Sequence, residues 1–347
     1  MKSRTVLALV VLAVAVAGAA WMFASPPASV SGTVEAERGT LMFPGLATKL
    51  AEASRVEITA KGRTLTIARE GADWGLPSRG GYPVDARRLR VLLTGLTLLR
   101  MDAPRTADPA LLERLGLGNP ESANSTANLV RVLDAKGNVL AALIVGHRRV
   151  YTEGGLPDSL YVRRPGQNQS WLAEGRLPVQ PDAELWLRRT VTDIAPQDVA
   201  SVAVHRGGSV LRFGRTGGKE ALLEPSPAPA LDPYRLDDVF RALQTLTLDD
   251  VKPAASAPGD PLGTARFTLT DGTTLTVSVF IPAEPVGKPL AAQTIWIQFA
   301  VGGTSPQARA LARRLTGWSY QVGIWKQKAF VPMLADLVAQ AAAPAAK

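Results

Sequence analysis

The chain has 347 residues, of which 46% are hydrophobic and 20% are charged, and its formal net charge is +9. This length allows two domains of ordinary size, and the composition is typical of a globular protein. The sequence contains no cysteine, which excludes disulfides, thiol catalysis and cysteine-ligated metal centres. The basic residues are scattered in pairs rather than gathered in a block, so the net charge does not indicate nucleic-acid binding.

A run of apolar and small residues occupies positions 5–24, directly after Lys2 and Arg4. Such a run is long enough for a helix of about 30 Å, the thickness of the hydrocarbon core of a membrane. Because positive charges precede it, the run predicts a transmembrane anchor with a cytoplasmic N-terminus. A cleaved signal peptide is the alternative, since the small residues at 17–20 resemble a cleavage site. We therefore expect a single-pass protein of the bacterial inner membrane with its bulk in the periplasm.

Changes in composition divide the sequence into four parts. The first is a cytoplasmic stub with the anchor, and the second is a Pro-, Ser- and Gly-rich segment that predicts a flexible linker. The third and fourth are each predicted to form an α+β module. In order, these parts are residues 1–24, 25–40, 41–196 and 197–347.

The two modules are predicted to be copies of one another. A hairpin pattern at 56–67 returns at 202–213, an offset of 146 residues. The N-cap residue of the following helix is Asp85 in the first copy and Asp232 in the second, an offset of 147. The ending Leu-x-x-Leu-Thr-Leu, which both copies share, matches at 150 instead. The alignment of the second helix with the first is thus uncertain by about one helical turn.

A second hairpin strengthens the repeat and indicates the fold class. Its turn contains Gly137 in the first copy and Gly272 in the second, and one more strand pattern follows each hairpin. Alternation with period two and tight turns predict antiparallel sheets with one face covered by helices. The predicted fold is therefore α+β: an N-terminal transmembrane helix, then two related modules, each an antiparallel sheet packed on helices. Further helices are predicted over 182–194, 305–315 and 333–340.

Motifs that carry chemistry are missing from the sequence. There is no P-loop, no dinucleotide fingerprint and no nucleophile elbow. The only histidines, His147 and His205, lack partners at the spacing of a metal site. Two acidic pairs occur at 237–238 and 249–250. We interpret the first pair as charges in the opening turn of a helix, where carboxylates suit the helix dipole, and the second as charges just beyond that helix. We predict no catalytic, cofactor-binding or metal-binding residue, no cofactor, and no enzymatic activity.

Four aromatic residues crowd into the C-terminal region, interleaved with two lysines. They are a candidate partner surface, since exposed aromatic clusters mark interaction sites. The alternative is that they close the core of the second module. The four residues are Trp318, Tyr320, Trp325 and Phe330.

Several short segments together resemble the domain-of-unknown-function 4340 family. They are Leu41–Leu46, Gly81–Asp85, Arg114–Leu117, Leu185–Arg188 and Gly317–Tyr320. The resemblance implies a membrane-anchored extracytoplasmic protein of a family with no established activity. It also implies an association with ABC transporters of the gliding-motility type, beside which such proteins are often encoded.

These expectations combine into one functional hypothesis and one alternative. The hypothesis is a membrane-anchored binding or scaffold protein, accessory to an envelope complex that contains an ABC transporter. Its partners would be the inner membrane, through residues 5–24, and the transporter or its auxiliary membrane subunits, with no nucleic acid. The alternative is an extracytoplasmic enzyme or ligand-binding protein whose site forms between the two modules.

Overall fold

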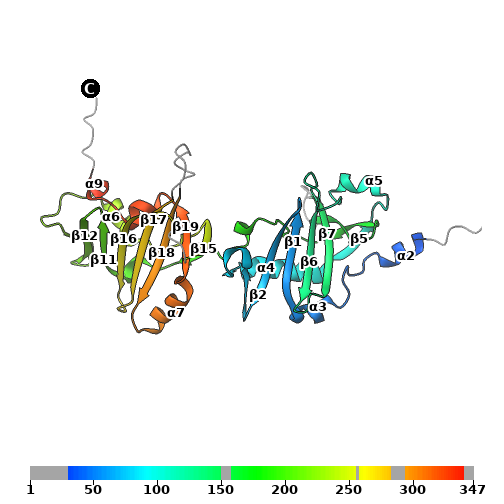
Figure 1. The fold of residues 1–347 in the computed structure, drawn as a ribbon, viewed down its shortest axis with the longest axis horizontal. Coiled ribbons are helices and arrows are strands. Elements are labelled where there is room, and N and C mark those ends of the chain that lie inside the picture. The colour runs from blue at the N-terminus through cyan, green and yellow to red at the C-terminus, as the bar shows by residue number, and fades with distance from the viewer. Residues whose placement is uncertain (1–29, 150–157, 255–257, 283–293, 340–347) are drawn as a thin grey trace, which may run out of the picture. The chain divides into compact units, whose positions relative to one another are not determined.

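Two antiparallel sheets organise the computed structural model, which describes residues 30–149, 158–254, 258–282 and 294–339 (Figure 1). The first sheet has nine strands in the order β4-β3-β2-β1-β6-β7-β8-β9-β5. The second has eight strands in the order β13-β12-β11-β16-β17-β18-β19-β15. By backbone contacts the described residues form two compact units: residues up to Thr64 with Arg90–Pro181, and Leu65–Leu89 with the residues from Asp182 onward.

The strands have the following bounds. In the first sheet they are β1 (Ala53–Ala60), β2 (Arg63–Glu70), β3 (Asp73–Leu76), β4 (Tyr82–Pro83), β5 (Arg100–Pro104), β6 (Asn128–Asp134), β7 (Val139–Arg149), β8 (Ser159–Arg163) and β9 (Ser170–Glu174). In the second they are β11 (Val199–Arg206), β12 (Ser209–Thr216), β13 (Lys219–Glu224), β15 (Asp250–Pro253), β16 (Asp260–Leu269), β17 (Thr274–Ile281), β18 (Thr294–Gly302) and β19 (Trp318–Gly323). A separate short ladder joins β10 (Thr190–Thr192) and β14 (Leu246–Thr247).

The helices are short. The α-helices are α2 (Val30–Glu37), α3 (Leu46–Lys49), α4 (Ala86–Leu98), α5 (Pro109–Leu112), α6 (Pro233–Phe240), α7 (Pro306–Leu315), α8 (Lys326–Phe330) and α9 (Leu334–Leu337). Single 3-10 turns are η1 (Leu50–Glu52), η2 (Pro77–Arg79), η3 (Glu113–Leu115), η4 (Ala183–Leu185) and η5 (Pro196–Asp198). Helix α2 lies in the segment expected to be a flexible linker.

The predicted duplication is confirmed by the strand order, because the second sheet repeats the first apart from β4. The register repeats as well. Val56 lies opposite Val132 in the first copy, and Val202 lies opposite Phe267 in the second. A bulge follows Ala53 in β1, and another follows Val199 at the equivalent place in β11. Because a bulge is a specific feature of strand pairing, its presence at the same place shows that the two copies agree in strand pairing as well as in strand order.

The helix of each copy is capped as the sequence predicts. The backbone N–H of Arg87 donates to Asp85 Oδ1 at 2.9 Å, and that of Tyr234 donates to Asp232 Oδ1 at 2.9 Å. The structure also resolves the open register. Helix α4 continues to Leu98, whereas α6 stops at Phe240 and a turn follows. The extra residues of that turn move the offset from 147 at the caps to 150 at the next strand.

A short pairing closes each copy in the same way. A bridge joins Val84 to Leu187, and Asp85 N–H donates to Trp186 O at 2.7 Å. In the second copy a bridge joins Leu231 to Val338, and the N–H of Asp232 donates to Leu337 O at 2.9 Å. The repeat therefore extends to the last described residues, well beyond the segments that the sequence had paired.

The predicted balance of helix and sheet was wrong, because the described fold is mostly antiparallel sheet. The longest described helix, α4, has 13 residues. The helix expected over 182–194 is a 3-10 turn followed by β10, whose residues are Thr190, Val191 and Thr192. β-Branched residues favour strands, and here a pairing partner in β14 was available. The helix expected over 333–340 has only four residues.

The predicted transmembrane anchor and single-pass inner-membrane localisation are corrected as well. No helix in the described part of the chain is long and apolar enough to span a membrane. The segment 5–24, on which the membrane and periplasmic assignments depended, lies outside the described residues. Nothing in the structure therefore supports these assignments, and we withdraw them.

The two sheets differ at one edge. In the first copy β4 covers β3, with Gly75 opposite Pro83 and Leu76 opposite Tyr82. The loop that brings β4 back crosses Gly75 so closely that a Cβ there would collide with the carbonyl of Gly81. The equivalent residue of β13 is Ala221, which does carry a Cβ, and no strand covers β13 among the described residues. A methyl group is thus enough to exclude the tight crossing from the second copy.

We expect Gly75→Ala to destabilise the protein by about 1–3 kcal/mol, because the new methyl overpacks against the Gly81 backbone. The matched control is Ala221→Gly, which meets no crossing loop and costs only the entropy of a strand glycine, about 0.5–1 kcal/mol. Urea unfolding of both variants measures the difference. Equal losses of free energy would contradict the proposed role of Gly75.

Candidate functional site

Within the described residues, no strand pairs with the outer edge of β13. The two-residue turn after Thr216 makes Thr216 and Lys219 a hydrogen-bonded pair, so the next residue, Glu220, directs its N–H and C=O away from β12. In the first copy the equivalent carbonyl, that of Trp74, accepts from Val84 N–H at 2.9 Å. In the second copy no strand of the described chain occupies this position. The edge can therefore accept an additional strand.

Exposed apolar side chains accompany this open edge. Leu223, at the irregular end of β13, is 47% exposed, and Val210 of the neighbouring β12 is 37% exposed. Polar residues normally protect a free edge against association, and Lys219 and Glu224 do so at the two ends of β13. Glu220 adds a third charge, although its side chain is paired with Arg215. The exposed apolar surface of the strand is therefore that of Leu223, of the kind found at protein-binding sites.

A groove of about 470 Å³ lies where β13 ends. Its floor includes the buried side chains of Val204 and Leu211, from β11 and β12. Met333, which is 50% exposed, stands at its rim. The described residues that line it are Val204, Arg206, Gly207, Ser209, Val210, Leu211, Pro225, Pro332, Met333 and Leu334. This size and apolar character suit a bound side chain or a small ligand.

The wall of the groove at Met333 is held by one carboxylate. Asp336 Oδ2 accepts from the N–H of Met333 at 3.0 Å, and its Oδ1 lies 2.9 Å from Lys328 Nζ. Burial opposes ionisation of Asp336. The hydrogen bond from Met333, the ion pair with Lys328 and the nearby Arg206 outweigh it and lower the pKa of Asp336 below its usual value.

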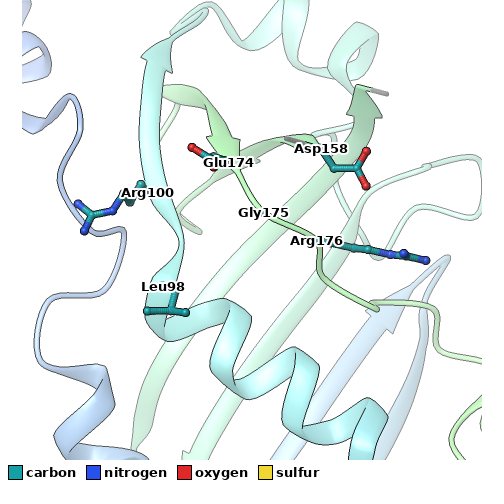
Figure 2. Close-up of a pocket in the computed structure, with 6 residues that line it drawn as sticks. All are labelled: Leu98, Arg100, Asp158, Glu174, Gly175 and Arg176. Atoms are coloured by element: carbon teal, nitrogen blue, oxygen red, sulfur yellow. The ribbon is translucent and has the colours of Figure 1, made fainter. Parts of the chain in front are cut away.

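A second, polar pocket of about 440 Å³ lies in the first unit. It is lined by Leu98, Arg100, Asp158, Glu174, Gly175 and Arg176 (Figure 2). Figure 2 shows the side chains of Arg100 and Arg176 extending in opposite directions, and the carboxylates of Glu174 and Asp158 likewise. Asp158 is already paired with Arg148. These charges do not converge on one point, so the pocket lacks the geometry of an acid–base site.

The four aromatic residues predicted as a partner surface do not form one patch. Tyr320 and Phe330 are buried in the second unit, with the ring of Phe330 edge-to-face against Phe267 at 6.2 Å. Trp318 is half-buried and packs edge-to-face against Tyr82 at 5.1 Å. Trp325 is 69% exposed. Two of the four residues therefore belong to the core, one is half-buried and one is exposed.

Four of the remaining sequence candidates have a side-chain partner. Asp237 pairs with Arg241, Asp249 with Arg189, and Asp250 with Arg79 at 2.7 Å. His147 Nε2 lies 3.2 Å from Thr126 Oγ1. Within the described residues no group of three or more His, Cys, Asp or Glu side chains could hold a metal ion.

The sequence did not single out the β13 edge or the groove. The one signal in the sequence was a difference between the two copies. Ala221 replaces Gly75, and a Pro-rich loop replaces the Gly-Gly-Tyr-Pro segment that forms β4. The significance of that difference depends on strand pairing, which the sequence leaves open.

Comparison with known proteins gives one result. A family model described as domain of unknown function (DUF4340) matches residues 74–266. The chain belongs to this DUF4340 family. The matched range of the DUF4340 model begins in β3 and ends in β16, so it includes part of each copy. No curated protein and no solved structure matches the chain.

The ion pair of Asp336 predicts a pH dependence. A carboxyl whose folded pKa is lowered contributes stability above its unfolded pKa of about 3.9 and loses that contribution as pH falls through the folded value. We expect Asp336→Asn to lose about 1 kcal/mol at pH 7. The gap between variant and wild type should begin to narrow below about pH 4. Urea unfolding at pH 7 and pH 3 measures the gap at both values, and a gap as large at pH 3 as at pH 7 would contradict the assignment.

Proposed function

We propose that this DUF4340 protein is a non-enzymatic binding protein whose second unit adds an extended segment of a partner protein to the edge of β13. The observation that carries the proposal is the unmatched edge. The first copy covers the equivalent strand with β4, whereas no strand of the described second copy covers β13. Strand addition to an exposed edge is a common mode of peptide recognition, in which ladder hydrogen bonds provide affinity.

The chemistry of the edge supports this mode over catalysis. Glu220 offers an N–H and a C=O to a new strand, and Leu223 offers apolar surface beside them. The polar pocket of the first unit holds divergent side chains. A subunit of an ABC-transporter complex, the partner class that the family resemblance implied, is the first natural partner to test.

The experiment uses a random nine-residue peptide library displayed on phage and selected against the full chain. We expect the enriched peptides to bind Glu220→Ala as they bind wild type, and to bind Glu220→Pro at least about tenfold more weakly. Proline removes the outward N–H and obstructs pairing, whereas alanine keeps that donor. Fluorescence anisotropy measures the affinities.

The two variants are matched because both remove the Glu220 side chain and its ion pair with Arg215. The inner ladder of β13 is retained in both, because Lys219 and Ala221 make its bonds to β12. Thermal unfolding confirms that each variant is folded. Equal peptide affinity in the two variants, or a selection that enriches no peptide, would refute strand addition at β13.

A further inference from the structure

The groove in the second unit is continuous with the open edge. Pro225, the residue directly after β13, lines the groove together with Val210 and Leu211 of the adjacent β12. A segment paired with β13 near Glu220 and running toward Glu224 therefore arrives at the groove. Side chains on one face of such a segment would enter it.

The lining of the groove specifies an apolar occupant. Val204, Leu211 and Pro332 are buried and contribute no charge. Met333 adds a flexible, polarisable wall that adapts to different apolar shapes. A side chain that fills this space gains the free energy of leaving water, and a polar one does not.

One charge breaks the apolar lining. Arg206 is the charged residue of the described lining, and no carboxylate lines the groove with it. Its Nη1 donates to Val331 O at 2.8 Å, which positions the guanidinium at the groove. Asp336, a carboxylate on which Arg206 acts electrostatically, is already bound by Lys328 and by the N–H of Met333. A guanidinium has five N–H donors, so Arg206 retains the capacity to bind a carboxylate.

The first copy lacks this feature. At the offset of 146 residues that aligns the hairpins, Ala60 occupies the position of Arg206. Asp182 in turn occupies the position of Met333 when the closing pairs of the two copies are aligned. The first copy therefore lacks both the arginine and the methionine that line the groove of the second copy.

We propose that the groove receives an apolar side chain of the partner segment and that Arg206 binds an aspartate or glutamate side chain next to it. The partner is then an extended segment with an apolar residue followed or preceded by an acidic one. This inference depends on the proposed strand addition at β13, and it adds the chemistry of the segment that is bound.

The test sequences the peptides that the same nine-residue library yields with three full-length proteins: wild type, Arg206→Gln and Arg206→Lys. With wild type we expect an apolar residue beside Asp or Glu to be enriched. Arg206→Gln removes the charge and should abolish the acidic preference, with a loss of about tenfold or more in affinity for the wild-type peptides. Arg206→Lys keeps the charge and should retain the preference.

A third variant tests whether negative charge at the rim of the groove repels the acidic peptides. Val210→Asp places a carboxylate at the rim, and we expect it to weaken the acidic peptides at least as much as Arg206→Gln does. Thermal unfolding of every variant confirms that it is folded.

The outcomes separate this inference from the proposal on which it depends. If peptides bind in a manner sensitive to Glu220→Pro but show no acidic preference, or retain it in Arg206→Gln, strand addition stands and the role of the groove is refuted. If no peptide is enriched with wild type, both are refuted.

Discussion

The antiparallel pairing of β1 with β6, and of β11 with β16, is the constraint on which the rest of the structure depends. These pairs lie inside their sheets, and their register decides which side chains face the core. Val56 and Ile58 are fully buried in β1, as are Val202 and Val204 in β11. Because side chains alternate with period two, a slip of one residue would turn these apolar side chains to the other face. Each ladder contains a bulge at the equivalent place, after Ala53 and after Val199, so the register of the two copies is the same.

From this common frame the two copies diverge at their edges. In the first copy Gly75 admits the crossing of Gly81, and Tyr82 is thereby placed in β4 and buried. In the second copy Ala221 excludes that crossing. The chain between β13 and α6 still makes the closing pair that both copies share, Leu231 with Val338, as Val84 pairs with Leu187 in the first copy. The two copies thus differ by one described edge strand, β4, while their central ladders have the same strand order.

The same comparison explains why the candidate site was difficult to find from sequence. The aromatic cluster was conspicuous as a list of residues, yet burial places Tyr320 and Phe330 in the core. The groove uses ordinary residues, such as Val204, Pro225 and Met333, that come from three separate parts of the chain. No spacing rule connects them, because only the sheet and the closing segment bring them together.

The sequence by itself determined the duplication, the hairpins and the capped helices, including Asp85 and Asp232. These features depend on local rules: period-two alternation, turn glycines and side chains that satisfy the first N–H groups of a helix. Tertiary structure decided the rest. Residues 190–192 became a strand because β14 was available to pair with them. No described strand covers β13, where Ala221 carries a Cβ that the close crossing at Gly75 would not accommodate. Such outcomes depend on contacts between residues distant in the chain, which local pattern does not encode.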